Sequence, residues 1–87
     1  MREDCWIICY DISDPKRLYR VAKALREVGT RRQWSVFECW LSAFALARLC
    51  RQLGRLIDRD CDSVRLYPIS GASASELTDS LATYFIV

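Results

Sequence analysis

The sequence of 87 residues contains no histidine, and only three glycines and two prolines. Without histidine the usual general base is missing, and no Ser-His or Cys-His arrangement for nucleophilic catalysis can form. Any hydrolytic activity would therefore need water activated by a metal ion. Internal repeats, linkers and low-complexity segments are absent from the sequence as well.

Long apolar runs are also missing from this chain. No stretch approaches the roughly 18 consecutive apolar residues of a transmembrane helix. The first charged residues, Arg2, Glu3 and Asp4, do not form the basic region that opens a signal peptide. We therefore expect a cytoplasmic protein that does not associate with a membrane.

The five cysteines are an odd number, and no two of them form a C-x-x-C pair. A zinc site needs four clustered nitrogen or sulfur ligands, and a disulfide scaffold needs even pairing in a secreted protein. We interpret the cysteines as reduced thiols packed in the core. They are Cys5, Cys9, Cys39, Cys50 and Cys61.

The length and composition predict one domain that covers residues 1–87. A domain of this size buries only roughly 60 to 65% of the surface that its unfolded chain exposes. The hydrophobic fraction of 52% is higher than the roughly 45 to 50% of a typical soluble domain. The chain also includes three Trp, four Tyr and three Phe. Because apolar surface should remain uncovered, we expect a homodimer with a self-complementary interface.

The net charge of +2 is unevenly distributed along the chain. Residues 14–32 hold seven basic and two acidic side chains, a local charge of +5, whereas residues 60–87 hold one basic and four acidic side chains, a local charge of −3. Eleven of the thirteen cations are arginine, whose planar guanidinium suits phosphate. The pattern favours a polyanion-binding face, although a solvated helix surface would give the same pattern.

The first half of the chain predicts a strand followed by a helix. Residues 5–12 form an apolar run typical of a buried central strand, with Asp11 at its carboxyl end. Asp14 and Pro15 are a typical N-cap and first helical residue. Apolar residues then recur every three or four positions until Gly29, where we expect the helix to end. This spacing leaves several basic side chains of the helix free to meet a ligand.

The remaining pattern predicts strands on either side of a second helix. We expect a strand at residues 33–41, with room for one more strand between Phe37 and Ser42, a helix at 43–59, and strands at 63–69 and 81–87. The order fits an α+β, ferredoxin-like βαββαβ sandwich, in which two helices back one antiparallel sheet that ends with a short C-terminal strand. This fold serves many functions and assigns none by itself.

Asp11 is the best candidate for a metal ligand, because it lies at a strand end beside a helix N-terminus that favours phosphate. One carboxylate rarely holds Mg²⁺ alone, and two Asp11 residues brought together in a two-fold dimer would make a shared site. A purely structural Asp11, which hydrogen-bonds the following turn, remains the alternative. Gln33 and Ser35 could contact phosphate or a partner's backbone, or they could be purely structural. Strand aromatics such as Tyr10 could stack on bases, or they could pack in the core or an interface.

Three ordered motifs, YDISD at residues 10–14, Q-x-SVFE at 33–38 and D-x-VR-x-Y at 62–67, resemble those of the CRISPR-associated protein 2 family across nearly the whole chain. The resemblance implies a ferredoxin-like homodimer in which residues 71–87 complete the partner's sheet. It further implies a role in spacer acquisition, where the protein bridges the CRISPR-associated protein 1 integrase and helps to hold the invading (protospacer) DNA. Family members are described as endonucleases on single-stranded RNA or double-stranded DNA.

The resemblance also assigns roles to individual residues. Asp11 becomes the catalytic residue and the ligand of Mg²⁺ or Mn²⁺. The expected nucleic-acid contacts are basic residues, Lys16, Arg17, Arg20, Arg31 and Arg32, and the expected supporting residues are Tyr10, Ser13, Gln33, Ser35 and Phe37. Two other functions stay open, namely a DNA-binding scaffold without catalysis and a general ferredoxin-like RNA-binding module.

Overall fold

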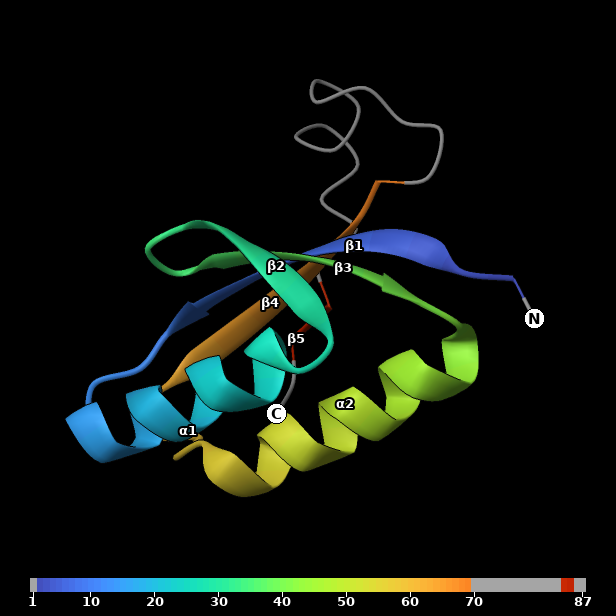
Figure 1. Ribbon diagram of the computed structural model, residues 1–87. Helices are drawn as coiled ribbons and strands as arrows, with labels where there is room; N and C mark the ends of the chain where they lie inside the picture. The colour runs from blue at the N-terminus through green and yellow to red at the C-terminus, as the bar shows by residue number, and fades with distance from the viewer. Residues whose placement is uncertain (1, 70–83, 86–87) are drawn as a thin grey trace.

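The computed structural model describes residues 2–69 and 84–85 of the chain. This part of the chain contains two helices and five strands, and each helix follows a strand (Figure 1). In chain order they are β1 (Asp4–Asp11), α1 (Pro15–Arg26), β2 (Gly29–Gln33), β3 (Val36–Leu41), α2 (Ala43–Leu56), β4 (Ser63–Pro68) and β5 (Tyr84–Phe85).

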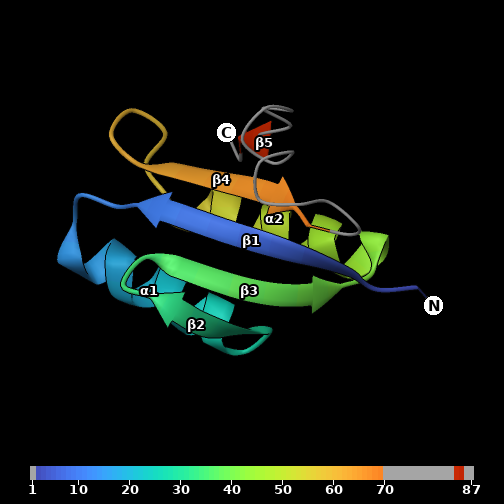
Figure 2. The same ribbon diagram turned by 90° about the horizontal axis from the view of Figure 1, so that it is seen from above.

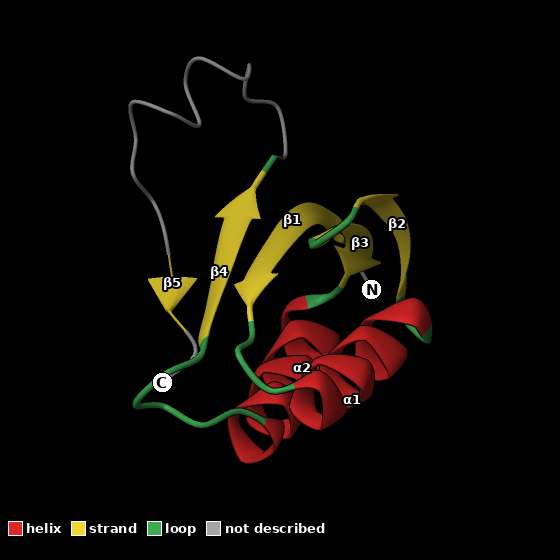
Figure 3. Cartoon of the chain, turned by 90° about the vertical axis from the view of Figure 1, so that its left-hand side faces the viewer, coloured by secondary structure: helices red, strands yellow, loops and turns green. Residues whose placement is uncertain are grey.

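All five strands belong to one sheet with the order β2-β3-β1-β4-β5, and every neighbouring pair is antiparallel. Figure 2 shows this order from above, with β1 in the middle of the sheet. Both helices pack against the same face, which leaves the opposite face without helical cover (Figure 3). The ferredoxin-like α+β fold predicted from the sequence is therefore confirmed.

The core lies between the helices and the covered face of the sheet. Ile8, Leu25, Phe37, Leu53 and Leu66 are almost completely buried there, and they come from β1, α1, β3, α2 and β4. β1, β3 and β4 send alternate side chains into this layer, as a half-covered sheet requires. The apolar stripes that predicted both helices are the faces that the helices bury.

The prediction for the second strand was wrong in its position. Residues 33–41 are not one strand, because a turn at Trp34 and Ser35 separates β2 from β3. The additional strand precedes this turn instead of lying between residues 37 and 42. In β2, a Cβ atom on Gly29 would collide with the Cys39 sulfur and lie 2.6 Å from the Glu38 carbonyl oxygen. Gly29 thus permits the close approach of β2 to β3, rather than ending the helix.

Both helices are shorter than the sequence predicted. α1 ends at Arg26, and α2 ends at Leu56 instead of Arg59. Beyond α2, the backbone of Ile57 turns to an extended conformation, while its N–H still donates to the carbonyl of Leu53. Arginines recur with a basic period of three or four residues along the predicted helix, at 48, 51, 55 and 59, and the last of them therefore lies in the connection before β4.

The C-terminal strand is described only at Tyr84–Phe85, where β5 pairs with β4 of the same chain. The other residues of the predicted strand at 81–87 lie outside the described part of the chain, as does most of the segment 71–87. The proposed exchange of this segment between two protomers stays a prediction. Neither helix within residues 2–69 has the length and apolar character needed to cross a membrane.

The cysteines are all free thiols, but they do not all lie in the core. Cys5 and Cys39 are buried, Cys9 and Cys50 are half-buried, and Cys61 is exposed in the connection between α2 and β4. The interpretation as core residues therefore fails for Cys61.

Candidate functional site

Asp11 is the last residue of β1, and its side chain is exposed. Its backbone pairs with Ser63 of β4. Because side chains alternate along a strand, Asp11 lies on the face opposite to the buried Tyr10, which is the face without helical cover. Within the described residues no hydrogen bond or ion pair involves the Asp11 carboxylate. The carboxylate is therefore available to an external ligand.

The expected supporting residues Tyr10, Ser35 and Phe37 meet at the turn between β2 and β3. The Tyr10 N–H donates to the Ser35 carbonyl at 3.1 Å, and its hydroxyl donates to the Trp34 carbonyl at 3.4 Å. The Tyr10 and Phe37 ring centroids lie 6.2 Å apart. These contacts fix the turn to the end of β1. Gln33 lies exposed at the end of β2 and makes no side-chain contact with the described residues.

The start of α1 confirms the predicted cap. The backbone of Asp14 is extended, and its carboxylate accepts a hydrogen bond of 3.0 Å from the N–H of Arg17. Pro15 follows as the first helical residue. Because Asp14 satisfies the helix N-terminus, it is already occupied and is no second metal ligand beside Asp11.

Asp62, which precedes β4, is the carboxylate that sequence reasoning missed. Its side chain is completely buried and accepts hydrogen bonds from three residues. Arg17 donates to it from Nε at 2.7 Å and from Nη2 at 3.3 Å. Ser13 donates from its backbone N–H at 3.0 Å and from its hydroxyl at 3.2 Å, and the backbone N–H of Asp58 donates at 2.8 Å. The Arg17 guanidinium, followed by the N–H donors of Asp58 and Ser13, holds the pKa of Asp62 far below its usual range, although burial opposes this shift.

Arg17 therefore differs from the expectation that it would be free to meet a ligand. Its guanidinium is committed to Asp62, and its Nη2 also donates to the Ser13 hydroxyl at 3.2 Å and to the Cys61 sulfur at 3.4 Å. Three segments meet here, namely the loop after β1, the first turn of α1 and the loop before β4. The only signal for Asp62 in the sequence was its place in the D-x-VR-x-Y motif.

The two arginines of β2 are also engaged. Arg32 forms a bidentate ion pair with Glu38 at 3.2 Å for each bond. This pair, together with a hydrogen bond from the Trp40 indole, lowers the pKa of Glu38. The Arg31 guanidinium lies 5.8 Å from the Trp34 ring centre and 5.4 Å from that of Phe37. Both side chains remain largely exposed, so these contacts leave them accessible to an anion.

Lys16 and Arg20 of α1 are exposed, as is Lys23. Their spacing of four and then three residues puts them on one face of the helix. In the described part of the chain none of the three forms an ion pair or a side-chain hydrogen bond. They are the cations of α1 that fit the expectation of a free basic face.

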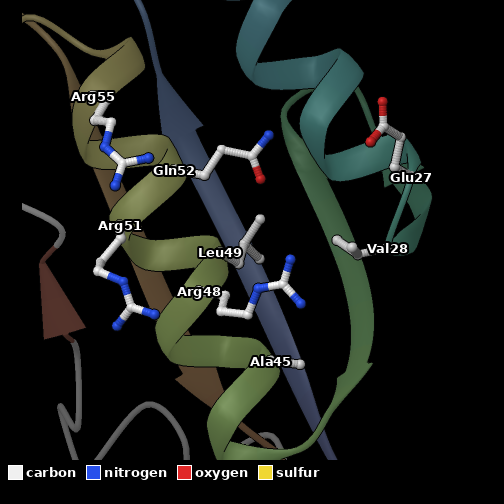
Figure 4. Close-up of a pocket in the computed structure, with 8 residues that line it drawn as sticks. All are labelled: Glu27, Val28, Ala45, Arg48, Leu49, Arg51, Gln52 and Arg55. Atoms are coloured by element: carbon white, nitrogen blue, oxygen red, sulfur yellow. The ribbon is translucent and has the colours of Figure 1, made fainter.

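A second basic surface, which the predicted site did not include, lies on α2. A groove of about 650 Å³ runs between this helix and the end of α1 (Figure 4). Arg48 and Gln52 extend toward the α1 side, and Glu27 and Val28 form the facing wall, whereas Arg51 and Arg55 extend from the other side of α2. The basic period of the sequence indicated these arginines but not the groove.

The chain also matches a family of known proteins. Residues 4–77 match the sequence profile of the family described as "CRISPR associated protein Cas2". The chain belongs to the Cas2 family. The resemblance inferred from the three motifs is thereby confirmed.

Individual Cas2 relatives agree with this assignment. The chain is 42% identical over 78 residues to "CRISPR-associated endoribonuclease Cas2 4" of Rhodospirillum rubrum, covering 90% of this chain and 63% of that protein. It is 39% identical over 71 residues to "CRISPR-associated endonuclease Cas2 2" of Thermus thermophilus, covering 82% of this chain and 79% of the relative. The chain thus spans less than two thirds of the first relative.

Solved structures show the same fold. A hypothetical protein from Thermus thermophilus, TT1823, superposes with a TM-score of 0.76 at 39% identity, covering 77% of this chain and 82% of that one. Cas2 of Streptococcus pyogenes superposes with a TM-score of 0.69 at 29% identity, covering 92% and 98%. The Cas2 fold is therefore shared even where sequence identity is moderate.

The donor set of one chain is small for a metal site. No group of three or more acidic or cysteine side chains that could hold a metal occurs within residues 2–69 and 84–85. Asp14 is a helix cap and Asp62 is buried in an ion pair, whereas Asp11 is exposed at the end of β1 and Asp58 and Asp60 are exposed in the loop before β4. Such a set fits Mg²⁺ or Mn²⁺ only if waters, phosphates or a second chain supply the other oxygens.

Proposed function

We propose that the chain is a nucleic-acid-binding subunit of CRISPR spacer acquisition, which works as a homodimer and cleaves a phosphodiester bond with the aid of Asp11. The observation that carries the proposal is the exposed Asp11 carboxylate without a partner among the described residues. Membership of the Cas2 family and the names of the relatives, which include endonuclease and endoribonuclease, support it. Single-stranded RNA and double-stranded DNA are the proposed substrates.

In this proposal Asp11 holds Mg²⁺ or Mn²⁺. Mg²⁺ is commonly bound through one or two carboxylates, with waters and substrate phosphates as the remaining ligands. Two Asp11 residues from two chains would supply both carboxylates. When bound, the metal supplies an activated water and neutralises phosphate charge. Lys16 and Arg20 hold the backbone of the substrate, because their charges are exposed and uncommitted.

The homodimer would form through the face of the sheet that no helix covers. Ile7, Cys9, Val36, Trp40 and Tyr67 lie on this face, since they alternate with buried residues, and Ile7 pairs with Tyr67 as Cys9 pairs with Val36. Trp40 is 57% exposed, a large apolar surface to leave in water. A two-fold pairing of this face would cover it and bring the two Asp11 side chains toward a common site.

Cleavage of labelled single-stranded RNA and duplex DNA, with Mg²⁺, with Mn²⁺ and with a chelator, tests the catalytic part. Asp11→Asn keeps the shape of the side chain but removes its charge, and we expect it to abolish metal-dependent cleavage. Glu3→Gln is the matched control, because Glu3 is also exposed and has no contact among the described residues. Cleavage that survives in Asp11→Asn would show that Asp11 is not the metal ligand.

Sedimentation analysis tests the dimer. We expect the native chain to sediment as a dimer and Trp40→Glu to sediment as a monomer, because a charge on the uncovered face opposes its burial. A variant at an exposed aromatic on the helical side, Phe44→Glu, serves as the control. A native chain that is monomeric at micromolar concentration would contradict the proposal.

A scaffold without catalysis is the second candidate function. The small donor set around Asp11 and the absence of histidine favour it. In this case the chain would bridge the CRISPR-associated protein 1 integrase and hold protospacer DNA with its basic surfaces. Co-purification with that integrase, combined with unchanged DNA binding in Asp11→Asn and no cleavage by the native chain, would select the scaffold.

A further inference from the structure

A small pocket lies at the edge of the molecule between α1 and the turn that joins β2 to β3. Its volume is about 220 Å³. Tyr10 and Leu18 belong to its lining, together with Tyr19 of α1 and Trp34 of the turn. A pocket of this size is smaller than the roughly 300–1,000 Å³ of a drug-sized site, so it suits one flat ring or one side chain.

Tyr19 and Trp34 are not core residues. Tyr19 is 62% exposed and Trp34 is 79% exposed. Single exposed aromatics are common, but these two come from different elements and line the same pocket. Packing within the described part of the chain does not account for their position. They form a surface on which another ring can stack.

Two arginines accompany these aromatic rings. The guanidinium carbon of Arg26 lies 5.9 Å from the centre of the Tyr19 ring, and that of Arg31 lies 5.8 Å from the centre of the Trp34 ring. Both arginines line the pocket, and no acidic residue of the described part of the chain does. The pocket therefore combines flat apolar surface with two uncompensated positive charges.

This combination matches the chemistry of a nucleotide that is not base-paired. An exposed base offers a flat π-surface to Tyr19 and Trp34, and its phosphates offer negative charge to the arginines. A base in a duplex is stacked between its neighbours and cannot enter a pocket. An apolar peptide side chain would fill the same volume but would leave both arginines without a counter-charge.

We propose that this pocket binds one unpaired base of a single-stranded nucleic acid, while Arg26 and Arg31 contact the adjacent phosphates. The inference rests on the proposed nucleic-acid function and deepens it, because it assigns a preference for single strands. Tyr10 lines the pocket and Asp11 follows it in β1, but alternation places the Asp11 carboxylate on the other face of the sheet. The pocket therefore holds the substrate and takes no part in bond cleavage.

Fluorescence anisotropy with a labelled 12-nucleotide single strand, as RNA and as DNA, and with the matching 12-bp duplex tests the pocket. The variants are Tyr19→Ala and Trp34→Ala. Phe44→Ala is a matched control, because Phe44 is also 62% exposed and also carries an arginine, Arg48, 5.9 Å from its ring centre. We expect each pocket variant to weaken single-strand binding roughly 5- to 150-fold, the range of one lost stacked base.

Duplex binding should change less than twofold in the same variants, and Phe44→Ala should bind both substrates like the native chain. Trp34→Phe provides a readout that a merely structural role would not give. It should keep most of the single-strand affinity, since a ring remains, but it should lose the quenching of tryptophan fluorescence that a bound base causes. The slope of affinity against salt should stay unchanged in Tyr19→Ala, and should become shallower in Arg26→Gln and Arg31→Gln.

The outcomes separate this inference from the proposed function. If the native chain binds single strands but the pocket variants bind them equally well, the pocket proposal is overturned and the nucleic-acid function stands. If single-strand and duplex affinities fall together, the aromatics contact a backbone and not a base, and the proposal is wrong. If the native chain binds no nucleic acid, and a proline-rich peptide instead quenches the fluorescence of Trp34, both proposals fail.

Discussion

Two carboxylates at the same end of the sheet illustrate how differently one chemical group can be used. Asp11 ends β1, and Asp62 directly precedes Ser63, the backbone partner of Asp11 in β4. The Asp11 carboxylate is exposed and forms no hydrogen bond or ion pair with the described residues, whereas the Asp62 side chain is completely buried and accepts hydrogen bonds from Arg17, Ser13 and Asp58. The donors around each group, not its position in the fold, decide its role.

The comparison also explains why the two residues should respond oppositely to substitution. A buried carboxylate with several donors stabilises the fold, because its removal leaves a half-buried arginine and backbone N–H groups without partners. An exposed carboxylate without partners contributes little to stability and remains free for a ligand. Asp62 belongs to the structure of this end of the molecule, and Asp11 to its chemistry.

The largest expected effect is that of Asp62→Ala. Loss of the carboxylate should lower the free energy of unfolding by about 3–5 kcal/mol. For a domain of this size the midpoint of thermal unfolding should fall by more than about 10 °C. Asp11→Ala should change stability by less than about 0.5 kcal/mol. Thermal and urea unfolding followed by circular dichroism measure both, and equal effects of the two substitutions would remove the distinction drawn between them.

The next prediction concerns the arginine partner of Asp62. Arg17→Ala should lower the urea midpoint clearly, because it leaves the Asp62 charge buried without its main donor. Arg20→Ala, in the same helix but exposed and unpaired among the described residues, should keep the native midpoint and weaken nucleic-acid binding instead. Binding measured against salt concentration gives the second readout.

Lys16→Ala is the control for this pair, because Lys16 shares the exposure of Arg20 but not its guanidinium. Like Arg20→Ala, it should weaken binding and make its salt dependence shallower, with full stability. A stable Arg17→Ala variant that loses binding would instead show that Arg17 contacts nucleic acid directly, as the sequence first indicated.

Acidification should remove the contribution of Asp62 to stability. Hydrogen bonding to Arg17 lowers the pKa of Asp62 in the folded state, so the unfolded chain binds more protons as the pH falls below about 4. The contribution of Asp62 to stability is therefore fully present above the pKa that this residue has in the unfolded chain, about 3.9. It is lost as the pH falls toward the lower pKa that Asp62 has in the folded state. Urea midpoints between pH 6 and pH 2 should show this decrease in Asp11→Asn but much less of it in Asp62→Asn.

The sequence predicted those parts of this region that depend on local patterns. The strand that ends at Asp11, the Asp14 cap and the stripe of α1 all follow from neighbouring residues, and the structure confirms them. The pairing of Arg17 with Asp62 joins residues 45 positions apart, and no periodicity connects them. For the same reason Arg17 looked like a free cation of a basic helix.

The hairpin shows a second limit of sequence reasoning. β2 is an edge strand with exposed residues from Thr30 to Gln33, so it has no alternation of apolar and polar side chains. It exists because β3 offers backbone partners and Gly29 allows close approach, which are both properties of the assembled sheet. The pocket beside Trp34 depends on this hairpin, and could not be found before the turn was placed.

The smallest expected effect extends the comparison to two thiols, one buried and one exposed. Burial raises the pKa of Cys39 to about 11, so at pH 8 its thiolate fraction is roughly 100-fold or more below that of an ordinary cysteine with a pKa of about 8.5. Cys61, next to the buried Asp62, is exposed. Labelling with a thiol reagent, followed by mass spectrometry, should therefore modify Cys61 first and Cys39 only on unfolding.

The variant Asp62→Asn should loosen the loop before β4. Cys61 should still react at nearly its native rate in this variant, because its exposure does not depend on the ion pair. Early modification of Cys39 in that variant would mean that the ion pair at the end of the sheet also holds the packing of β3, and that the two regions unfold together.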